Sequence, residues 1–238
     1  GYSSSGEVVQ TGKGVSDFHT GDRVVSNGNH AEYVVVNQNL CTRIPDNTDI
    51  KEASFTVLGS IALHGLRLSE TSLGSKVVVI GLGIIGQLVC RLAEAQGSEV
   101  IGIDPDTKRT DMSANFYTSV EEANMTNVDS VIITAATSSN EPIEVATKIA
   151  RNKAKIVVVG DIPLNISRND FYYKELELVV SKSYGPGRYD KQYEILGKDY
   201  PIEYVRWTEN RNFEAFIKLL SQNCLLYTSP SPRDSFRS

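Results

Sequence analysis

The sequence predicts an α/β protein in which a doubly wound parallel sheet follows a smaller β-rich segment. Three observations carry this prediction. Short strand-like runs between residues 6 and 50 are separated by Gly, Asn and Asp turns. The run KVVVI at 76–80 is apolar throughout, apart from its first residue, as a strand buried on both faces should be. From there on, strand-like and helix-like segments alternate, which indicates parallel strands with right-handed crossovers.

The first 50 residues are predicted to form strands of a small barrel or sandwich. The strand-like runs are GEVVQTG, DRVVS and AEYVVVN, followed by the approach to IPDN. After Pro45 the pattern changes, and DIKEASFTVLGSIALHGLRLS is predicted to be helical from its acidic first turn onward.

The alternating part of the chain predicts its elements in order. The expected strands are 76–80, 98–104, 129–135, 155–161 and 176–184, and the expected helices are 84–95 and 141–152. Residues 105–128 are too short and polar for an assignment. A last helix is expected over 208–220, where Phe213, Phe216, Ile217 and Leu220 share one face.

Composition restricts the function classes. The 238 residues carry a net charge of −5 with no run of Lys or Arg, which argues against a nucleic-acid surface. No apolar stretch approaches the roughly 18 residues of a membrane span, and no signal peptide is recognised. The three cysteines, Cys41, Cys90 and Cys224, are far apart and odd in number, which fits a reducing cytoplasm and no disulfide scaffold.

The two ends are expected to be fragment ends. The chain begins at Gly1 within a turn that enters a strand. At the other end, a Ser/Pro-rich segment follows the last predicted helix abruptly, and its residues CLLYTSPSPRD match a translation of a sequencing-library adapter. Residues 224–238 are therefore predicted to be non-native and are set apart from the fold.

The stretch VVVIGLGIIGQLV has the spacing of a dinucleotide fingerprint. Gly81 permits a tight strand-to-helix turn, Gly83 lets a pyrophosphate approach the backbone, and Gly86 lets the helix pack on the strand. The N–H groups of the helix start would face the phosphates. The whole turn is expected to contact the cofactor: Gly81, Leu82, Gly83, Ile84, Ile85 and Gly86.

An acid at the end of the next strand completes the fingerprint. Asp104 lies 23 residues after Gly81 and is expected to accept hydrogen bonds from the adenosine ribose. Its charge would repel a 2′-phosphate, so NAD is favoured over NADP, although the nearby Arg109 could soften that preference. Two alternatives remain: a turn of this kind without a ligand, and a methyltransferase, against which Ile80 speaks because those folds usually place an acid there.

The order of motifs resembles the medium-chain dehydrogenase/reductase, or zinc-type alcohol dehydrogenase-like, superfamily. Over residues 1–223 the matching pieces are GYSSSGEVV, GDRV, HAEYVVV, IPDN, ASFTVLGSIALHG, VVVIGLGIIG, VIGID and VVVGD. The closing SYGPGRYD and DYPIEYVRWTENRNFEAF look like the dehydrogenase part of bacterial bi-domain oxidoreductases, in which a second oxidoreductase domain follows.

This resemblance implies a domain plan. It consists of a partial GroES-like β-barrel at 1–52, a Rossmann NAD(P)-binding domain at 53–187, and a truncated return segment at 188–223. It also implies hydride transfer between a nicotinamide and an alcohol or carbonyl carbon of a small-molecule substrate. Thr134, Ala135 and Asp161 match positions that line the nicotinamide. Homo-oligomers and a second C-terminal domain in the intact protein follow from the same resemblance.

The sequence departs from the family at the zinc ligands. The second and third ligand positions align with Tyr2 or Ser3 and with Leu58, which do not suit zinc, and the first would precede Gly1. Only five residues separate GDRV from HAEY, and none is Cys, so no structural zinc is expected either. The residues at these positions therefore predict that no zinc is bound, and Asp104 favours NAD as the cofactor.

The catalytic residue is not identified from the sequence. His30 and His64 are weak acid/base candidates, since both have structural explanations as a strand-end and a packed helical residue. The weak substrate-contact candidates are Tyr2, Tyr184, Arg188 and Tyr189, whose aromatic and guanidinium groups would suit a sugar-like substrate.

The leading hypothesis is a zinc-independent, NAD(H)-dependent oxidoreductase of the medium-chain class. One alternative is an NADPH-dependent quinone- or enoyl-reductase-like enzyme, against which Asp104 argues. The other is a nucleotide-binding module without turnover that belongs to a larger two-domain protein.

Overall fold

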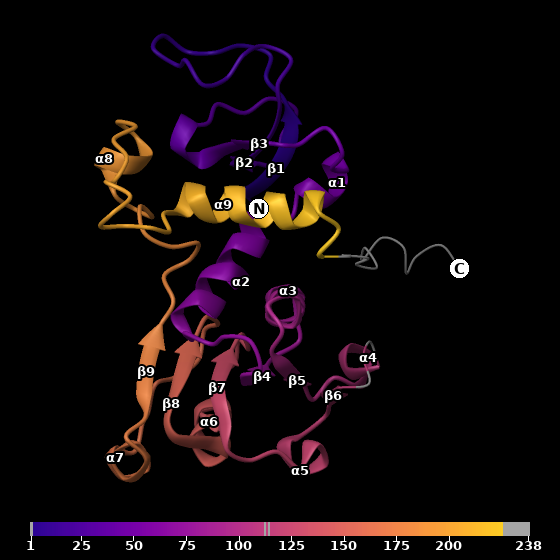
Figure 1. Ribbon diagram of the computed structural model, residues 1–238, viewed down its shortest axis with the longest axis vertical. Coiled ribbons are helices and arrows are strands. Elements are labelled where there is room, and N and C mark those ends of the chain that lie inside the picture. The colour runs from indigo at the N-terminus through magenta and orange to yellow at the C-terminus, as the bar shows by residue number, and fades with distance from the viewer. Residues whose placement is uncertain (1, 112, 114, 226–238) are drawn as a thin grey trace.

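The computed structural model describes residues 2–111, 113 and 115–225, and Figure 1 shows two sheets joined by long helices. The small sheet has three strands in the order β1-β2-β3, and the large sheet has six in the order β6-β5-β4-β7-β8-β9. Residues 226–238, most of the predicted non-native tail, lie outside the described residues. Within the part of the chain that the structure describes, no helix combines the length and hydropathy of a membrane span.

The small sheet is antiparallel and holds the predicted β-rich segment. Its strands are β1 (Tyr2–Glu7), β2 (Arg23–Asn29) and β3 (Cys41–Arg43). The strand expected over 31–37 is wrong: those residues form a loop, followed by the 3₁₀ helix η1 (Gln38–Leu40). Both edges of β2 are already paired, so the loop has no place beside it. Its Val35 is fully exposed.

The helix expected after Pro45 is two helices. The first, α1 (Ile50–Ala53), is capped by Asp49, whose side chain accepts hydrogen bonds from two backbone N–H groups. The second, α2 (Thr56–Leu68), runs between the two sheets and packs against α9 (Glu209–Ser221). Gly59 of α2 makes this packing close, because a Cβ there would lie 2.1 Å from the Phe216 ring of α9.

The large sheet is parallel, and its order matches the doubly wound prediction. Its strands are β4 (Lys76–Ile80), β5 (Glu99–Ile103), β6 (Phe116–Tyr117), β7 (Val128–Ile133), β8 (Ala150–Val158) and β9 (Glu177–Val180). In chain order the arrangement is 3-2-1-4-5-6, so the direction of winding reverses between β4 and β7. Ligands bind at such a switch point, outside the carboxyl ends of the strands.

Both faces of the large sheet are buried, which explains the uninterrupted apolar run of β4. Val77 and Val79 pack in a core with α2, α3 (Ile84–Ala95) and α9, while Val78 and Ile80 pack in a second core on the opposite face. That second core includes residues of α6 (Glu141–Ile149). The predicted helix over 141–152 ends earlier because the chain is already in β8 at Ala150.

Several short helices complete the large domain. The unassigned segment 105–128 contains β6 and two short helices, α4 (Thr107–Thr110) and α5 (Val120–Ala123). A third, α7 (Arg168–Lys174), lies between β8 and β9, and α8 (Lys191–Glu194) belongs to the return segment.

Candidate cofactor-binding site

The turn between β4 and α3 requires glycine at its first position. Gly81 has φ +96°, a region that favours glycine, and its N–H donates to the Ile103 carbonyl of β5 at 2.8 Å. A Cβ at this position would lie 2.6 Å from the backbone nitrogen of Ala135. The first glycine therefore serves both the turn and the contact with β7.

Gly86 lets α3 pack on the turn. A Cβ on Gly86 would lie 1.9 Å from the Gly81 carbonyl oxygen and 2.7 Å from the Thr134 hydroxyl. Because the nearest atom is backbone, no rotamer change could relieve the clash. The third glycine has the packing role that the sequence predicted.

Gly83 differs from the other two glycines. It is the N-cap of α3 with φ −65° and ψ −174°, a conformation open to any residue. A Cβ there would have no protein atom within 4 Å. Neither backbone strain nor packing among the described residues requires glycine at this position. A ligand that approaches the backbone is the remaining physical reason, and the pyrophosphate of a dinucleotide fits it.

The residues between the glycines surround the start of α3. Leu82 is buried and fills the core, while Ile84 is 44 % exposed. The first N–H groups of α3 have no acceptor within the helix, so Ile84 and Ile85 can present theirs to a ligand. An anion at the end of this helix would be stabilised by these donors and by the helix dipole.

Asp104 follows β5 and lies beside the turn. Its Oδ2 accepts hydrogen bonds from the Leu82 N–H at 2.7 Å and from Arg109 Nη1 at 3.0 Å, and its Oδ1 accepts from the Asp106 N–H at 2.9 Å. Burial by itself would raise the pKa of this carboxyl, but the two backbone donors and Arg109 together hold the pKa below its ordinary value. The Asp104 side chain is therefore an ionised carboxylate, and its hydrogen bond from the Leu82 N–H holds it against the turn between β4 and α3.

Arg109 is tied to the acids around it. Its guanidinium pairs with Asp104 and, at 3.6 Å, with Asp106, while its side chain stays 47 % exposed. A guanidinium held by two carboxylates is neutralised locally, which reduces its attraction for a 2′-phosphate.

Thr134, Ala135 and Asp161 lie at the carboxyl ends of β7 and β8. The N–H groups of Thr134 and Ala135 both donate to the Ile80 carbonyl, and the Thr134 hydroxyl donates to the Gly81 carbonyl at 2.5 Å. The Asp161 carbonyl accepts from the Thr137 N–H at 3.0 Å, and the Asp161 side chain is exposed. The structure thus brings these three positions to the same sheet edge as the glycine turn.

Gly160 belongs to this edge and was not singled out from the sequence. A Cβ there would lie 2.0 Å from the Ala135 carbonyl oxygen, so only glycine allows the ends of β7 and β8 to come this close. Its position directly after the run VVV is the sequence signal that could have identified it.

The two histidine candidates lie in different surroundings. His30 is exposed directly after β2. His64 is buried on α2, and burial, with a smaller effect of Arg67, lowers its pKa to about 4. A Cβ at Gly185 would lie 3.2 Å from His64 Nδ1, so this ring packs against the loop that follows β9. His64 is neutral and enclosed, as a packed helical histidine would be.

The substrate-contact candidates are not gathered in one open site. Tyr2 is 47 % exposed in β1, whereas Tyr184 is fully buried and its hydroxyl accepts a hydrogen bond from Asn27. Arg188 pairs with Glu194 at 2.7 Å and lies 4.0 Å from the ring centroid of Tyr189, which is 66 % exposed. Of these four side chains, Tyr2 and Tyr189 present most of their surface to solvent.

The positions aligned with zinc ligands do not offer zinc donors. Ser3 donates its hydroxyl to the Ser54 carbonyl, and Leu58 packs against the core. No three His, Cys, Asp or Glu side chains of residues 2–111, 113 and 115–225 are grouped so that they could hold a metal ion. Hydroxyl and alkyl groups in place of Cys and His do not fit a catalytic zinc.

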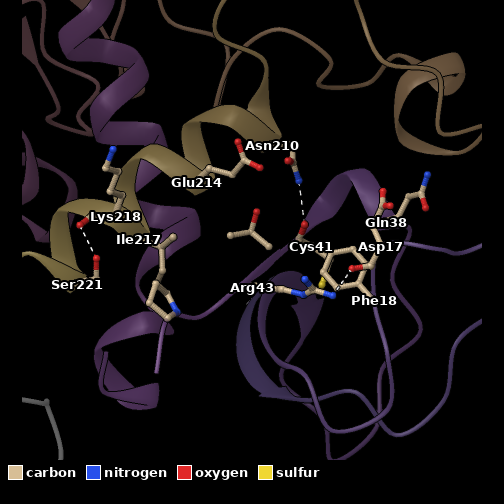
Figure 2. A pocket seen from close by; sticks show the side chains of 12 residues that line it. Asp17, Phe18, Gln38, Cys41, Arg43, Asn210, Glu214, Ile217, Lys218 and Ser221 are labelled. Atoms are coloured by element: carbon tan, nitrogen blue, oxygen red, sulfur yellow. Dashed lines mark hydrogen bonds between the residues drawn. The ribbon is translucent and has the colours of Figure 1, made fainter. Parts of the chain in front are cut away.

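A cavity of about 480 Å³ lies away from this site, between α9 and the small sheet. Figure 2 shows Glu214, Ile217 and Lys218 of α9 on one side and Arg43 with Phe18 on the other. None of the predicted cofactor residues lines it. Burial raises the pKa of its Cys41 thiol to about 12, so the cavity holds no reactive thiolate.

Two family models match the chain. The alcohol dehydrogenase GroES-like domain matches residues 1–46, and the NAD-binding domain of D-isomer specific 2-hydroxyacid dehydrogenases matches residues 58–170. The second match covers the glycine turn and the sheet from β4 to β8.

The curated relatives include sugar and polyol dehydrogenases. The chain is 24 % identical to 2-dehydro-3-deoxy-L-galactonate 5-dehydrogenase of Pseudoalteromonas atlantica, over 82 % of this chain and 70 % of the relative. It is 35 % identical to D-guloside 3-dehydrogenase of Escherichia coli, over 45 % of this chain and 32 % of the relative. The chain thus spans about a third of the length of the second relative.

Solved structures share the fold over almost the whole chain. Galactitol-1-phosphate dehydrogenase of Escherichia coli aligns with a TM-score of 0.74 at 21 % identity, covering 93 % of this chain and 72 % of that one. A zinc-binding dehydrogenase of Sinorhizobium meliloti, solved with NADP, aligns with a TM-score of 0.73 at 20 % identity, covering 94 % and 72 %. At these identities the similarity shows the fold.

Proposed function

We propose that this chain, which belongs to the medium-chain dehydrogenase/reductase superfamily, binds NAD(H) at the carboxyl edge of its large sheet and transfers hydride to or from an alcohol or carbonyl carbon. The substrate would be small and sugar-like, in keeping with the polyol and sugar dehydrogenases among its relatives. The domain plan of 1–52, 53–187 and 188–223 is part of this proposal.

One observation carries the proposal: the open backbone at Gly83 beside the fixed carboxylate of Asp104. A Cβ on Gly83 would meet no protein atom within 4 Å, while Asp104 is held at the end of β5 by the N–H of Leu82. An anion-accepting helix start next to a ribose-accepting acid is the arrangement of a dinucleotide site.

The protein would bind and orient, and the nicotinamide would supply the hydride acceptor or donor. The start of α3 would hold the pyrophosphate, and Asp104 would hold the ribose diol. Thr134, Ala135 and Asp161 would line the nicotinamide side, because β7 ends next to β4 and β8 ends next to β7.

We propose that the reaction does not use zinc, because the donors at Tyr2, Ser3 and Leu58 do not suit the metal. A zinc-independent enzyme needs a hydrogen-bond donor or a general acid at the substrate oxygen. His30 and His64 stay weak candidates for that group. The enclosure of His64 among packed side chains favours a structural role.

NAD is proposed over NADP because of charge. A 2′-phosphate would approach the Asp104 carboxylate, and Arg109 is already paired with Asp104 and Asp106. The alternative is an NADPH-dependent reductase in which Arg109 leaves these acids and binds the phosphate.

Titration of the full chain with NADH and NADPH, followed by nicotinamide fluorescence, tests this proposal. We expect NADH to bind at least about tenfold more tightly, since each 1.4 kcal/mol of repulsion costs a factor of ten. Gly83→Val should abolish binding by filling the open backbone site. Gly6→Val is the matched control, because a Cβ on Gly6 also meets no protein atom. Tighter NADPH binding would contradict the argument from Asp104.

Hydride transfer is tested separately from binding. If the chain binds NADH but the intact protein shows no turnover with polyols, ketoses or sugar acids, the alternative of a nucleotide-binding module is favoured. A cytoplasmic location, a homo-oligomer and a second C-terminal oxidoreductase domain in the intact protein belong to the same proposal.

A further inference from the structure

Lys182 lies at the same sheet edge as the proposed cofactor site. It comes two residues after the end of β9, and the N–H of the intervening Ser181 donates to the Val158 carbonyl of β8 at 2.8 Å. Val158 is paired with Val180, and Gly160 and Lys182 each come two residues after that pair. Figure 1 shows the ends of β8 and β9 side by side, with the chain then rising toward α8.

Four neighbouring strands therefore present a continuous row of positions. A Cβ on Gly81 or on Gly160 would collide with Ala135, and Lys182 follows the pair Val158–Val180 by the same two residues as Gly160. With strands about 4.8 Å apart, Lys182 lies roughly 14 Å from the turn that would hold the pyrophosphate. A dinucleotide that extends from α3 across β7 and β8 would bring its nicotinamide half toward Lys182.

The loop after β9 holds Lys182 facing outward. Ser183, Gly185, Gly187 and Tyr189 all have positive φ, and for the non-glycine residues this conformation is uncommon. The loop coils back so that Lys182 Nζ lies 5.4 Å from the ring centroid of Tyr189. Both side chains are exposed, so the ammonium is positioned without being covered.

Lys182 makes no direct ion pair with any described residue, although Asp190 and Glu209 lie near enough to interact with its charge. The neighbouring Arg188 is paired with Glu194. Asp190 accepts hydrogen bonds from the Tyr200 hydroxyl and from the Gln192 N–H, and it makes no ion pair with Lys182. The ammonium therefore stays available to a ligand.

Asp161 is the second available charge at this edge. It comes one residue after Gly160, and its exposed carboxylate makes no hydrogen bond or ion pair with any described residue. An acid and a base on neighbouring strand ends that do not pair with one another can each contact a different group of one ligand. A carboxylate accepts hydrogen bonds from hydroxyl groups, and an ammonium binds an anion.

We infer that the substrate is a polyhydroxylated anion of the sugar-acid type, whose anionic group binds Lys182 and whose hydroxyl groups donate to Asp161. This inference rests on the proposed function, because it places the substrate beside the nicotinamide half of the cofactor. To the proposed function it adds the class of substrate and names Lys182 as the residue that selects the anion.

Calorimetric titration of the full chain with D-gluconate, D-glucitol and D-glucitol 6-phosphate tests the inference, with and without NADH. These compounds share a carbon chain of hydroxyl groups and differ in charge. We expect gluconate to bind at least about tenfold more tightly than glucitol, as a charge-assisted hydrogen bond would give. Still tighter binding of the 6-phosphate would support the contact and identify the anion as a phosphate.

Variants assign the preference to Lys182. Lys182→Met should remove the preference for the anion, and Lys182→Arg should retain most of it because the charge is kept. Lys191→Met is the matched control, an exposed lysine in α8 with no ion pair among the described residues. NADH binding should be unchanged in all three variants.

Two results would overturn the inference: equal affinity of the parent chain for gluconate and glucitol, or a Lys182→Met variant that keeps the preference. Failure of the proposed function has a different signature. It would appear as absent NADH binding, while the anion preference would still be measured on the protein without cofactor.

Discussion

At the scale of single residues, each of the three glycines of the dinucleotide fingerprint is explained by a different physical cause. Gly81 is required by a positive φ and by its contact with Ala135, and Gly86 is required by the backbone oxygen of Gly81. Gly83 is required by neither conformation nor packing. Two positions of the fingerprint therefore serve folding, the third is the one we propose to serve a ligand, and experiment can separate these roles.

Gly86→Ala and Gly83→Ala should differ sharply in stability. The Cβ at position 86 would lie 1.9 Å from a backbone oxygen, so α3 must shift, and we expect a cost of about 2 to 3 kcal/mol. The Cβ at position 83 meets open space, and replacing an N-cap glycine should cost less than about 1 kcal/mol. Urea unfolding of the two variants measures both values. Equal costs would show that position 83 is also set by the fold.

At the scale of elements, α9 ties the return segment to the rest of the molecule. Asn210 donates to the carbonyls of Asn39 and Cys41, and Asn212 donates to the Tyr184 carbonyl. Arg67 of α2 donates to Asn212 and lies 3.4 Å from the ring centroid of Trp207. Asn210 and Asn212 thus satisfy backbone groups of the small domain and of the loop after β9.

Glu209, in the first turn of α9, should make stability depend on pH. It is fully buried and neither carboxyl oxygen has a hydrogen-bond partner among the described residues. Burial, with a smaller effect of Glu194, raises its pKa to about 8, against partial opposition from Arg188 and Lys182. Between pH 4.5 and 8 the unfolded chain loses this proton while the folded chain keeps it. Stability should therefore fall with rising pH by roughly 1.4 kcal/mol per pH unit.

Urea unfolding at pH 5, 6, 7 and 8 measures this slope. Below pH 4.5 both states are protonated, and above pH 8 both are ionised, so the contribution changes only within this window. Glu209→Gln removes the titrating group and should gain stability relative to the parent as pH rises. Glu203→Gln, at an exposed position, should follow the parent curve. If the free energy of unfolding changed with pH in parallel for Glu209→Gln and the parent, Glu209 would not be the protonated buried group.

At the scale of the whole molecule, two sheets share a core through helices that run between them. The core that holds Val77 of the large sheet also holds Val25 of the small sheet and Phe216 of α9. A ligand at the carboxyl edge of the large sheet would therefore stabilise a cooperative unit rather than one strand end. This coupling makes thermal unfolding a readout of binding.

NADH should raise the melting temperature of the full chain. At a concentration one hundred times its Kd, a ligand that binds only the folded state adds about 2.7 kcal/mol. For a chain of this size that corresponds to a shift of roughly 5 to 10 °C. Differential scanning fluorimetry measures it, and Gly83→Val should show no shift. A shift that persists in Gly83→Val would place the cofactor elsewhere.

Much of the large domain could be predicted because its signals are local. The run KVVVI matches β4, and the helix expected over 84–95 matches α3. The superfamily predicted from the order of motifs agrees with the GroES-like alcohol dehydrogenase model over residues 1–46, with the NAD-binding model over 58–170 and with the related dehydrogenases. The bi-domain subgroup and the site residues stay predictions.

The wrong or missing predictions concern residues whose structure or burial depends on contact with an element far away in the sequence. The run AEYVVVN has strand-like residues, but β2 is already paired on both sides, so the run is a loop. Tyr184 looked like a cleft residue, yet Asn27 and Phe213 enclose it, and that contact joins segments far apart in the chain. Lys182 and Glu209 carry no local signal, since exposure and burial follow from tertiary packing.

By itself, the sequence determined where strands and helices lie in the large domain, and where glycines and an acid mark a dinucleotide turn. Hydrophobic period, turn residues and motif spacing are properties of neighbouring residues, so they can be read along the chain. The tertiary structure decided which glycine is free of protein contacts, which acids and bases are paired, and which side chains stay exposed near the carboxyl edge. Those outcomes depend on distances between residues remote in sequence, and packing sets them.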